Sequence, residues 1–201
     1  MKTRLTLTAI FIASFALSGC TSTPGDTAQT DTANPANATQ DILDASACIG
    51  STEPPAAWAS KLNLVDDPQL LASSLGQPTK GKLCQGKVYE VKEGEALTVF
   101  RAWNSTNPNS QFGAWWAANQ PNGKVAQYRA GYEICYQWSP LDKMTRCELK
   151  PGSKLVIGNG QSAQCSEWLT YPVSAEQQLY LEDTETLVSN CQTYDAVFGW
   201  E

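Results

Sequence analysis

Residues 86–92 (GKVYEVK) and 96–103 (ALTVFRAW) decide the fold class, because both are rich in β-branched and aromatic residues. They flank Glu93-Gly94-Glu95, a short polar segment that is typical of a hairpin turn. The two segments are therefore predicted to pair as antiparallel strands. Further β-rich segments follow along the chain at 112–118, within 148–157 on both sides of Pro151-Gly152, and at 177–182.

Two helices are predicted, one before these strands and one among them. Asp67 is suited to be an N-cap, Pro68 fits the first turn, and Gly76 ends the helix. Residues 124–135 place apolar and aromatic side chains at spacings of three and four, which favours a second helix. The segment 184–200 is ambiguous. Because strands predominate, we expect an α+β fold with a split antiparallel sheet and two or three short helices.

The composition excludes several kinds of site. The chain has 201 residues and no histidine, so it contains no Ser-His-Asp triad, no Cys-His pair and no His-ligated metal. A general base must then be a carboxylate or, less commonly, Lys, Tyr or Cys. The net charge of -6 argues against nucleic acid as a partner, because that interaction needs clustered Lys and Arg.

The first twenty residues resemble the export signal of a bacterial lipoprotein. Lys2 and Arg4 precede an apolar run, 5–17, that is shorter than the roughly 20 residues of a membrane-spanning helix. The run ends in Leu17-Ser18-Gly19-Cys20, which resembles the lipobox. The alternative is an ordinary signal peptide with a chance cysteine. The resemblance implies that residues 1–19 are a signal peptide and that Cys20 carries the lipid.

The lipid would anchor the mature chain in the cell envelope. Thr21 follows the cysteine, where an aspartate would favour inner-membrane retention, so the outer membrane is expected in a Gram-negative host. Residues 20–41 are predicted to be the lipidated cysteine and a disordered tether, because 21–41 lack large apolar side chains. A single globular domain is expected over 42–201. Without Lys2 and Arg4, the mature chain has 12 basic and 20 acidic residues, a net charge of -8.

Six cysteines remain after Cys20, and an even number in an exported chain predicts three disulfides. Fifteen pairings are formally open. The pairing favoured here joins neighbours along the sequence: Cys48–Cys84, Cys135–Cys147 and Cys165–Cys191. A cysteine-only metal site is the alternative, and the absence of any CxxC spacing argues against it. No metal is therefore expected.

Arg101 is the most informative single residue, since it lies within the apolar strand Val99-Phe100-Arg101-Ala102-Trp103. One interpretation places Arg101 on the solvent face, with Phe100 and Ala102 inward. The other places it in a cleft, where the guanidinium binds a phosphate or carboxylate. Trp115 and Trp116 are adjacent on a predicted strand, so they should point to opposite faces and at most one belongs to the core.

The run from Val99 to Leu181 resembles the catalytic domains of ADP-ribosyltransferase-like toxins and NAD glycohydrolases. The resemblance rests on motifs in a fixed order: Thr98-Val99-Phe100-Arg101, Gly113-Ala114-Trp115-Trp116, Tyr128-Arg129, the Pro151-Gly152 turn with its strand, and Glu176-Gln177-Gln178-Leu179-Tyr180-Leu181. It covers about 80 residues.

The resemblance implies a site for NAD as substrate. Arg101 would clamp the diphosphate or ribose, and Trp115 or Trp116 would pack on the nicotinamide. Gln178 would occupy the catalytic position, with Glu176 nearby. Arg129 and Gln164 would line the pocket. Transferases of this group usually carry Glu where Gln178 stands, so the resemblance favours NAD hydrolysis over protein ADP-ribosylation.

Two other functions remain open from the sequence. The acidic, disulfide-rich body fits an envelope lipoprotein that binds a protein partner, of the inhibitor or immunity type. The seven tryptophans also fit a saccharide-binding module. Convergence of Arg101, Gln178 and one of the paired tryptophans in one cleft would favour the NAD-directed enzyme.

Overall fold

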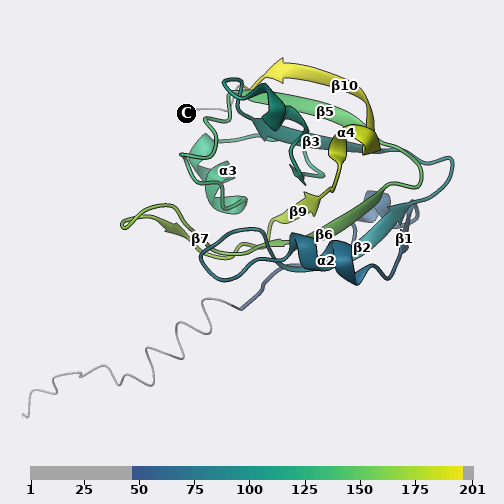
Figure 1. Ribbon diagram of the computed structural model, residues 1–201, viewed down its shortest axis with the longest axis horizontal. Helices are drawn as coiled ribbons and strands as arrows, with labels where there is room; N and C mark the ends of the chain where they lie inside the picture. The colour runs from purple at the N-terminus through teal and green to yellow at the C-terminus, as the bar shows by residue number, and fades with distance from the viewer. Residues whose placement is uncertain (1–46, 197–201) are drawn as a thin grey trace, which may run out of the picture. The chain divides into compact units, whose positions relative to one another are not determined.

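The computed structural model describes residues 47–196 and contains two antiparallel sheets with three short α-helices (Figure 1). The larger sheet has the strand order β1 (Leu62–Leu64), β2 (Leu83–Val91), β6 (Lys154–Gly160), β9 (Gln177–Tyr180) and β4 (Trp115–Trp116). The smaller sheet has the order β10 (Val188–Asp195), β5 (Lys143–Leu149) and β3 (Leu97–Trp103). A separate hairpin pairs β7 (Ala163–Gln164) with β8 (Thr170–Tyr171).

The helices are short: 3-10 helices η1 (Ala56–Trp58), which precedes β1, and η2 (Pro108–Phe112), and α-helices α2 (Pro68–Ser74), α3 (Val125–Gly131) and α4 (Thr184–Leu187). This arrangement confirms the predicted α+β class with a split antiparallel sheet. The disulfides confirm that the fold is stapled.

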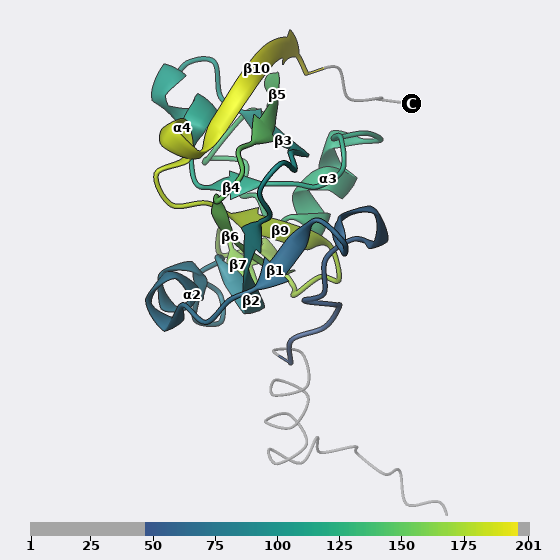
Figure 2. The ribbon, with the colours of Figure 1, turned by 90° about the vertical axis from the view of Figure 1, so that its right-hand side faces the viewer.

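The main core fills the space between the two sheets. Fully buried side chains from both sheets meet there: Val91, Leu155, Ile157 and Leu179 from the larger sheet, and Leu97, Val99 and Leu149 from the smaller. The other face of the larger sheet is covered by α2, whose Leu70 packs with Val88 and Val156. Alternate residues of β2 and β6 thus enter different apolar clusters, and both strands are apolar on both faces. Figure 2 shows α2 and the smaller sheet on opposite sides of the larger one.

Helix α2 forms as the sequence predicts. Pro68 begins it, and the Asp67 carboxylate accepts a hydrogen bond of 3.0 Å from the Leu70 amide. That amide is one of the donors that the first turn of a helix leaves unpaired. The Lys154 ammonium also contacts Asp67 at 2.9 Å, so the cap is tied to β6.

The predicted hairpin of 86–92 with 96–103 is wrong, although both segments are strands. β2 pairs with β1 and β6, whereas β3 pairs with β5 and belongs to the other sheet. The turn at Glu93-Gly94-Glu95 therefore carries the chain from one sheet to the other. The Pro151-Gly152 turn carries it back between β5 and β6, and the two turns meet where the Gly152 amide donates to the Val91 carbonyl. A turn signal shows where a strand ends but does not identify its partner.

Three disulfides are present, and only one of the predicted pairings is correct. Cys48–Cys84 is confirmed. The other two bonds are Cys135–Cys165 and Cys147–Cys191, in place of the predicted Cys135–Cys147 and Cys165–Cys191. Cys147 lies in the middle of β5, and its bond crosses to β10, which pairs with β5. Partners in this fold are set by strand pairing and not by closeness along the chain.

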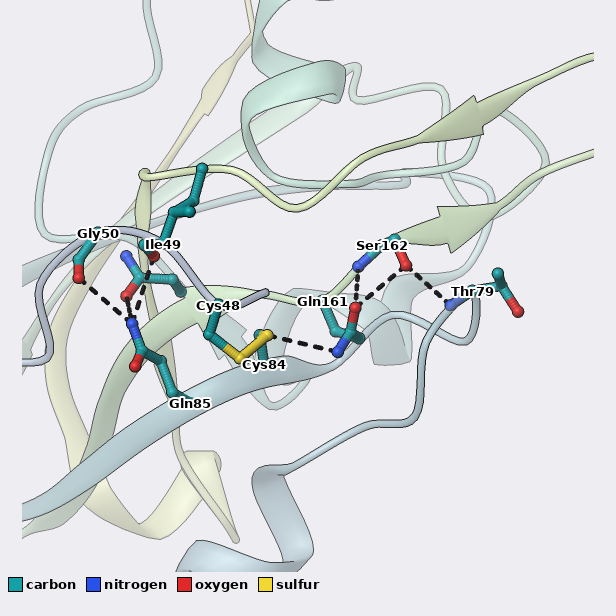
Figure 3. Close-up of a disulfide and its surroundings, with 9 residues drawn as sticks. Cys48, Ile49, Gly50, Thr79, Cys84, Gln85, Gln161 and Ser162 are labelled. Carbon is teal, nitrogen blue, oxygen red and sulfur yellow. Dashed lines mark hydrogen bonds between the residues drawn. A yellow bond between two sulfur atoms is a disulfide. The ribbon is translucent and has the colours of Figure 1, made fainter. Parts of the chain in front are cut away.

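The Cys48–Cys84 bond fastens the first described residues to the beginning of β2 (Figure 3). The Gln161 side-chain amide donates to Cys84 Sγ, and its oxygen accepts from the amide and hydroxyl of Ser162. Ser162 Oγ in turn accepts from the Thr79 amide at 2.9 Å. On the other side of the bond, the Gln85 side-chain amide lies 3.1 Å from Asn159 Oδ1. These polar contacts fix the segment that precedes β2.

The predicted signal peptide 1–19, the lipidated Cys20 and the tether 20–41 lie outside the described residues. Within residues 47–196, no helix is both long enough and apolar enough to cross a membrane.

Candidate functional site

A cavity of about 200 Å³ opens where β3, β4 and β9 meet α3 and the segment that follows it. Its walls come from parts of the chain that are far apart in sequence. The residues that line it include Arg101, Trp115, Trp116, Tyr128, Glu133 and Gln178. Four of these six are residues that the sequence analysis assigned to a site.

The Arg101 side chain points inward, because it lies on the same face of β3 as two buried residues. Val99 and Trp103, two positions away on β3, are 0% and 7% exposed, so the Arg101 side chain shares their face. The interpretation that put Phe100 and Ala102 inward and Arg101 in solvent is therefore wrong. That interpretation rested on the free-energy cost of burying a charged side chain. Hydrogen bonds to backbone carbonyls offset this cost here.

Two backbone carbonyls hold the Arg101 guanidinium. Nε donates to the Ser110 carbonyl at 2.7 Å, and Nη1 donates to the Trp115 carbonyl at 2.5 Å. Burial lowers the pKa of Arg101 to about 10, which still leaves it charged at neutral pH. No hydrogen bond of Nη2 is found among residues 47–196. This nitrogen lies against Gly113, where a Cβ atom would collide with it.

Glu133 is the least expected member of the site. It is only 2% exposed and has a positive backbone φ of 47°, a region that residues other than glycine seldom adopt. The Gln178 side-chain amide donates to Glu133 Oε2 at 2.6 Å. Gly160 of β6 lies beneath this pair, and a Cβ atom there would collide with both side chains. The fold thus keeps open a space for a carboxyl–amide pair.

The second carboxyl oxygen of Glu133 has no partner. Among the described residues, Oε1 is the one buried side-chain nitrogen or oxygen without a hydrogen bond. Burial raises the pKa of Glu133 from 4.5 to about 8, while groups of Ser174 and Gln178 oppose this rise and the charge of Glu176 adds to it. The Ser174 hydroxyl, which lies near this carboxyl, donates its single proton to the Gly131 carbonyl at 2.6 Å.

At neutral pH the Glu133 carboxyl is therefore mostly a neutral acid. Because Oε2 accepts from Gln178, the acidic proton belongs on Oε1, a buried atom of a residue that lines the cavity. A buried acid with a raised pKa and a charged arginine that line one cavity are groups from which enzymes build acid–base sites. Tyr128 and Tyr132 of the α3 region stack with ring centroids 4.5 Å apart and form an aromatic wall.

The two adjacent tryptophans face opposite ways, as the sequence predicts. Trp116 is 2% exposed and belongs to the core between the sheets. The Trp115 ring packs against Tyr180, with centroids 5.0 Å apart, next to the cluster under α2. Both residues line the cavity, and Trp115 also contributes the carbonyl that holds Arg101.

Three other predicted site residues do not line the cavity. Glu176 and Gln164 are exposed, with Gln164 on the β7–β8 hairpin. Arg129 donates to the carbonyls of Ile134, Cys135 and Ser139, and so shapes the segment after α3. Burial lowers the pKa of Arg129. Its contact with Ser139 at 2.6 Å fixes the segment that carries Glu133. The predicted lipidation site, Cys20, lies outside the described residues.

Glu133 and Tyr132 were missed because their signal is three-dimensional. In the sequence, Gly-Tyr-Glu-Ile-Cys (131–135) reads as the end of a helix, where an acidic residue is expected in solvent. Helix α3 instead ends at Gly131, and the positive φ at Glu133 turns its side chain inward. Among residues 47–196, no group of three or more His, Cys, Asp or Glu side chains is placed to hold a metal ion.

No protein-family model, curated protein or solved structure matches this chain.

Proposed function

We propose that the domain binds NAD, or a compound built like it, and hydrolyses the bond between nicotinamide and ribose. The observation that carries the proposal is the convergence of Arg101, Trp115, Trp116 and Gln178 on one cavity. These residues lie on β3, β4 and β9, and they are the ones that the resemblance to NAD glycohydrolases assigned to the clamp, the platform and the catalytic position.

The chemistry of the cavity supports a ligand with an aromatic end and an anionic or hydroxyl-rich end. Tyr128 and Tyr132 provide ring surface, and Arg101 Nη2 offers a charged donor that the protein leaves without a hydrogen bond among residues 47–196. At about 200 Å³ the cavity is smaller than typical pockets for whole drug-sized ligands. It would therefore hold the nicotinamide end, with the rest of the dinucleotide outside.

Breaking this glycosidic bond needs neither histidine nor a metal. The nicotinamide leaves as a neutral ring after taking the bonding electrons, and the ribose develops positive charge. The Gln178 side-chain amide lies 2.6 Å from the Glu133 carboxyl group. A carboxyl group is therefore present next to the catalytic position, although Gln stands where the transferases usually carry Glu. The proposal places this enzyme in the cell envelope, attached through lipid on Cys20.

The proposal is tested by calorimetry of the full chain in mild detergent with NAD, combined with chromatographic measurement of nicotinamide release. Arg101→Lys should weaken NAD binding about tenfold or more, because the lysine cannot reproduce the forked donors. Arg146→Lys is the matched control, since Arg146 lies on β5 outside this cavity and contacts Thr98. If the wild-type chain neither binds NAD nor releases nicotinamide, the proposal is wrong.

A second candidate function is saccharide binding by exposed aromatic side chains. Trp168 is 88% exposed at the tip of the β7–β8 hairpin, and Tyr136 and Trp138 are 58% and 52% exposed. The Cys135–Cys165 bond connects the segments that carry them. Exposed aromatic faces are suited to stacking on sugar rings. Titration with oligosaccharides should then change tryptophan fluorescence, and Trp168→Ala should abolish the change; no response in the wild-type chain excludes this function for the sugars tested.

A further inference from the structure

Glu133 Oε1 is a polar atom whose position the fold itself does not explain. It is buried without a hydrogen bond, which costs about 1–3 kcal/mol in a protein interior and more if the group is charged. Its residue also adopts φ of 47°, and its neighbour in space, Gly160, must lack a side chain. A salt bridge would be the usual compensation, but no ion pair involves Glu133 among residues 47–196.

The carboxyl also lies at the cavity and not in the closed core. Glu133 and its partner Gln178 both contribute to the wall of the cavity that Arg101 lines. Since Oε2 is occupied by the Gln178 amide, Oε1 is the oxygen left for a molecule in the cavity. A water molecule or a ligand hydroxyl that enters the cavity would supply the missing hydrogen bond.

We propose that Glu133 is the catalytic base of this site, with Oε1 accepting the proton of the water that attacks the substrate. The inference rests on the proposed function and adds the residue that activates the nucleophile, which neither the sequence nor the resemblance indicated. Gln178 is then a positioning residue, because its amide holds the carboxyl through Oε2 and leaves Oε1 without a protein hydrogen bond.

The reaction balances with groups that the site and solvent provide. The bond between the ribose anomeric carbon and the nicotinamide nitrogen breaks, and its electron pair stays on the nitrogen. The water oxygen forms the new bond to the anomeric carbon, and one water proton passes to Glu133 Oε1. Glu133 later returns this proton to solvent, so the products are nicotinamide, ADP-ribose and one released proton.

This mechanism requires the ionised form of Glu133, so the rate should depend on pH. Burial raises the pKa of this carboxyl to about 8, which makes the base scarce at pH 6 and abundant above pH 8. Five other charged or titratable groups line the cavity or lie near the carboxyl. They are Arg101 on β3, Tyr128 and Tyr132 at α3, Lys82 beside the cavity, and Glu176 before β9.

The arginine and the two tyrosines keep their charge states over the pH range of the test. Burial raises the pKa of Tyr132 to about 12 and raises that of Tyr128 as well, so both rings stay neutral below pH 9. The pKa of Arg101, lowered to about 10 by burial, leaves it charged there. Lys82 Nζ donates to the Ser73 carbonyl, away from the carboxyl pair.

The test compares full-chain wild type with Glu133→Gln in NAD binding and in nicotinamide release between pH 6 and pH 9. Gln has the shape of the protonated acid, so Glu133→Gln should fold and bind NAD as wild type does at pH 6. Its turnover should fall about 100-fold or more at pH 8, because general bases contribute roughly that factor. Wild-type turnover should rise nearly tenfold per pH unit below pH 8, and the variant should lose this dependence.

Two further variants separate catalysis from damage to the fold. Glu133→Asp keeps the acid but withdraws it by one methylene, so its rate should fall while the pH dependence remains. Glu167→Gln removes an exposed carboxyl on the β7–β8 hairpin and should leave both rate and pH profile unchanged. If wild type cleaves NAD and Glu133→Gln cleaves it equally well, the inference is wrong and the proposed function stands. If wild type does not cleave NAD, both are wrong.

Discussion

Replacing Glu133 with Gln should stabilise the folded protein in a pH-dependent way, whether or not a ligand is present. The folded-state pKa of this carboxyl is about 8, against 4.5 for an exposed glutamate, so the folded state binds more protons than the unfolded state between these values. The neutral acid therefore makes its whole contribution to the free energy of unfolding below about pH 4.5, and this contribution is lost as the pH rises towards 8. Gln keeps the neutral shape and does not titrate.

The magnitude follows from proton linkage. Each pH unit between the two pKa values changes the free energy of unfolding by about 1.4 kcal/mol per proton. Between pH 5 and pH 8, Glu133→Gln should therefore gain about 3–4 kcal/mol over wild type. Because all other groups titrate equally in both proteins, the difference between them isolates Glu133.

Urea unfolding of both proteins with disulfides intact, at pH 5, 6, 7 and 8, measures this difference. The unfolding midpoints should nearly coincide at pH 5 and separate by about 1–3 M urea at pH 8, given the usual urea dependence of small domains. Glu167→Gln, on the exposed hairpin, should follow wild type throughout. A constant difference between Glu133→Gln and wild type across this range would refute the account of a buried, neutral carboxyl.

Three other changes test separate parts of the structure. Gly113→Ala adds a side chain at a position with an ordinary backbone φ of -64°, so the backbone is not strained. Its Cβ atom would displace the Arg101 guanidinium, so NAD binding should weaken about tenfold. Calorimetry measures both this binding and the thermal unfolding of the variant. Cys147→Ala together with Cys191→Ala removes a bond across 44 residues and should lower the free energy of unfolding by about 2–4 kcal/mol; peptide mapping that finds Cys135 joined to Cys147 would refute the pairing. Cys20→Ser should move the protein from the membrane to the soluble fraction, and continued membrane association contradicts the lipid anchor.

Local features of the fold were predictable from the sequence because short-range chemistry fixes them. The Asp67-Pro68 start of α2 depends on one side chain and one amide three residues away. The opposite orientation of Trp115 and Trp116 follows from the period of a strand. The prediction of three disulfides depended only on an even number of cysteines in a chain expected to be exported.

The pairing of strands and cysteines was not predictable, because it depends on contacts between distant segments. β2 and β3 are consecutive in the sequence, yet each finds its partner in a different sheet. Cys147 pairs with Cys191 because β10 returns to β5 after the chain has built β6 to β9. The same difference applies to the site. Arg101 and Gln178 could be predicted from the sequence of their own strands, whereas Glu133 reaches the cavity only because the backbone turns there at a positive φ.

The rate of nicotinamide release from NAD by the full chain, measured at pH 6 and pH 8, tests the central claim most directly. The account predicts measurable turnover at pH 8 and a rate at least tenfold lower at pH 6, since the cavity carboxyl must ionise to act as the base. Absence of nicotinamide release at both pH values would contradict the assignment of this cavity as a site for NAD cleavage.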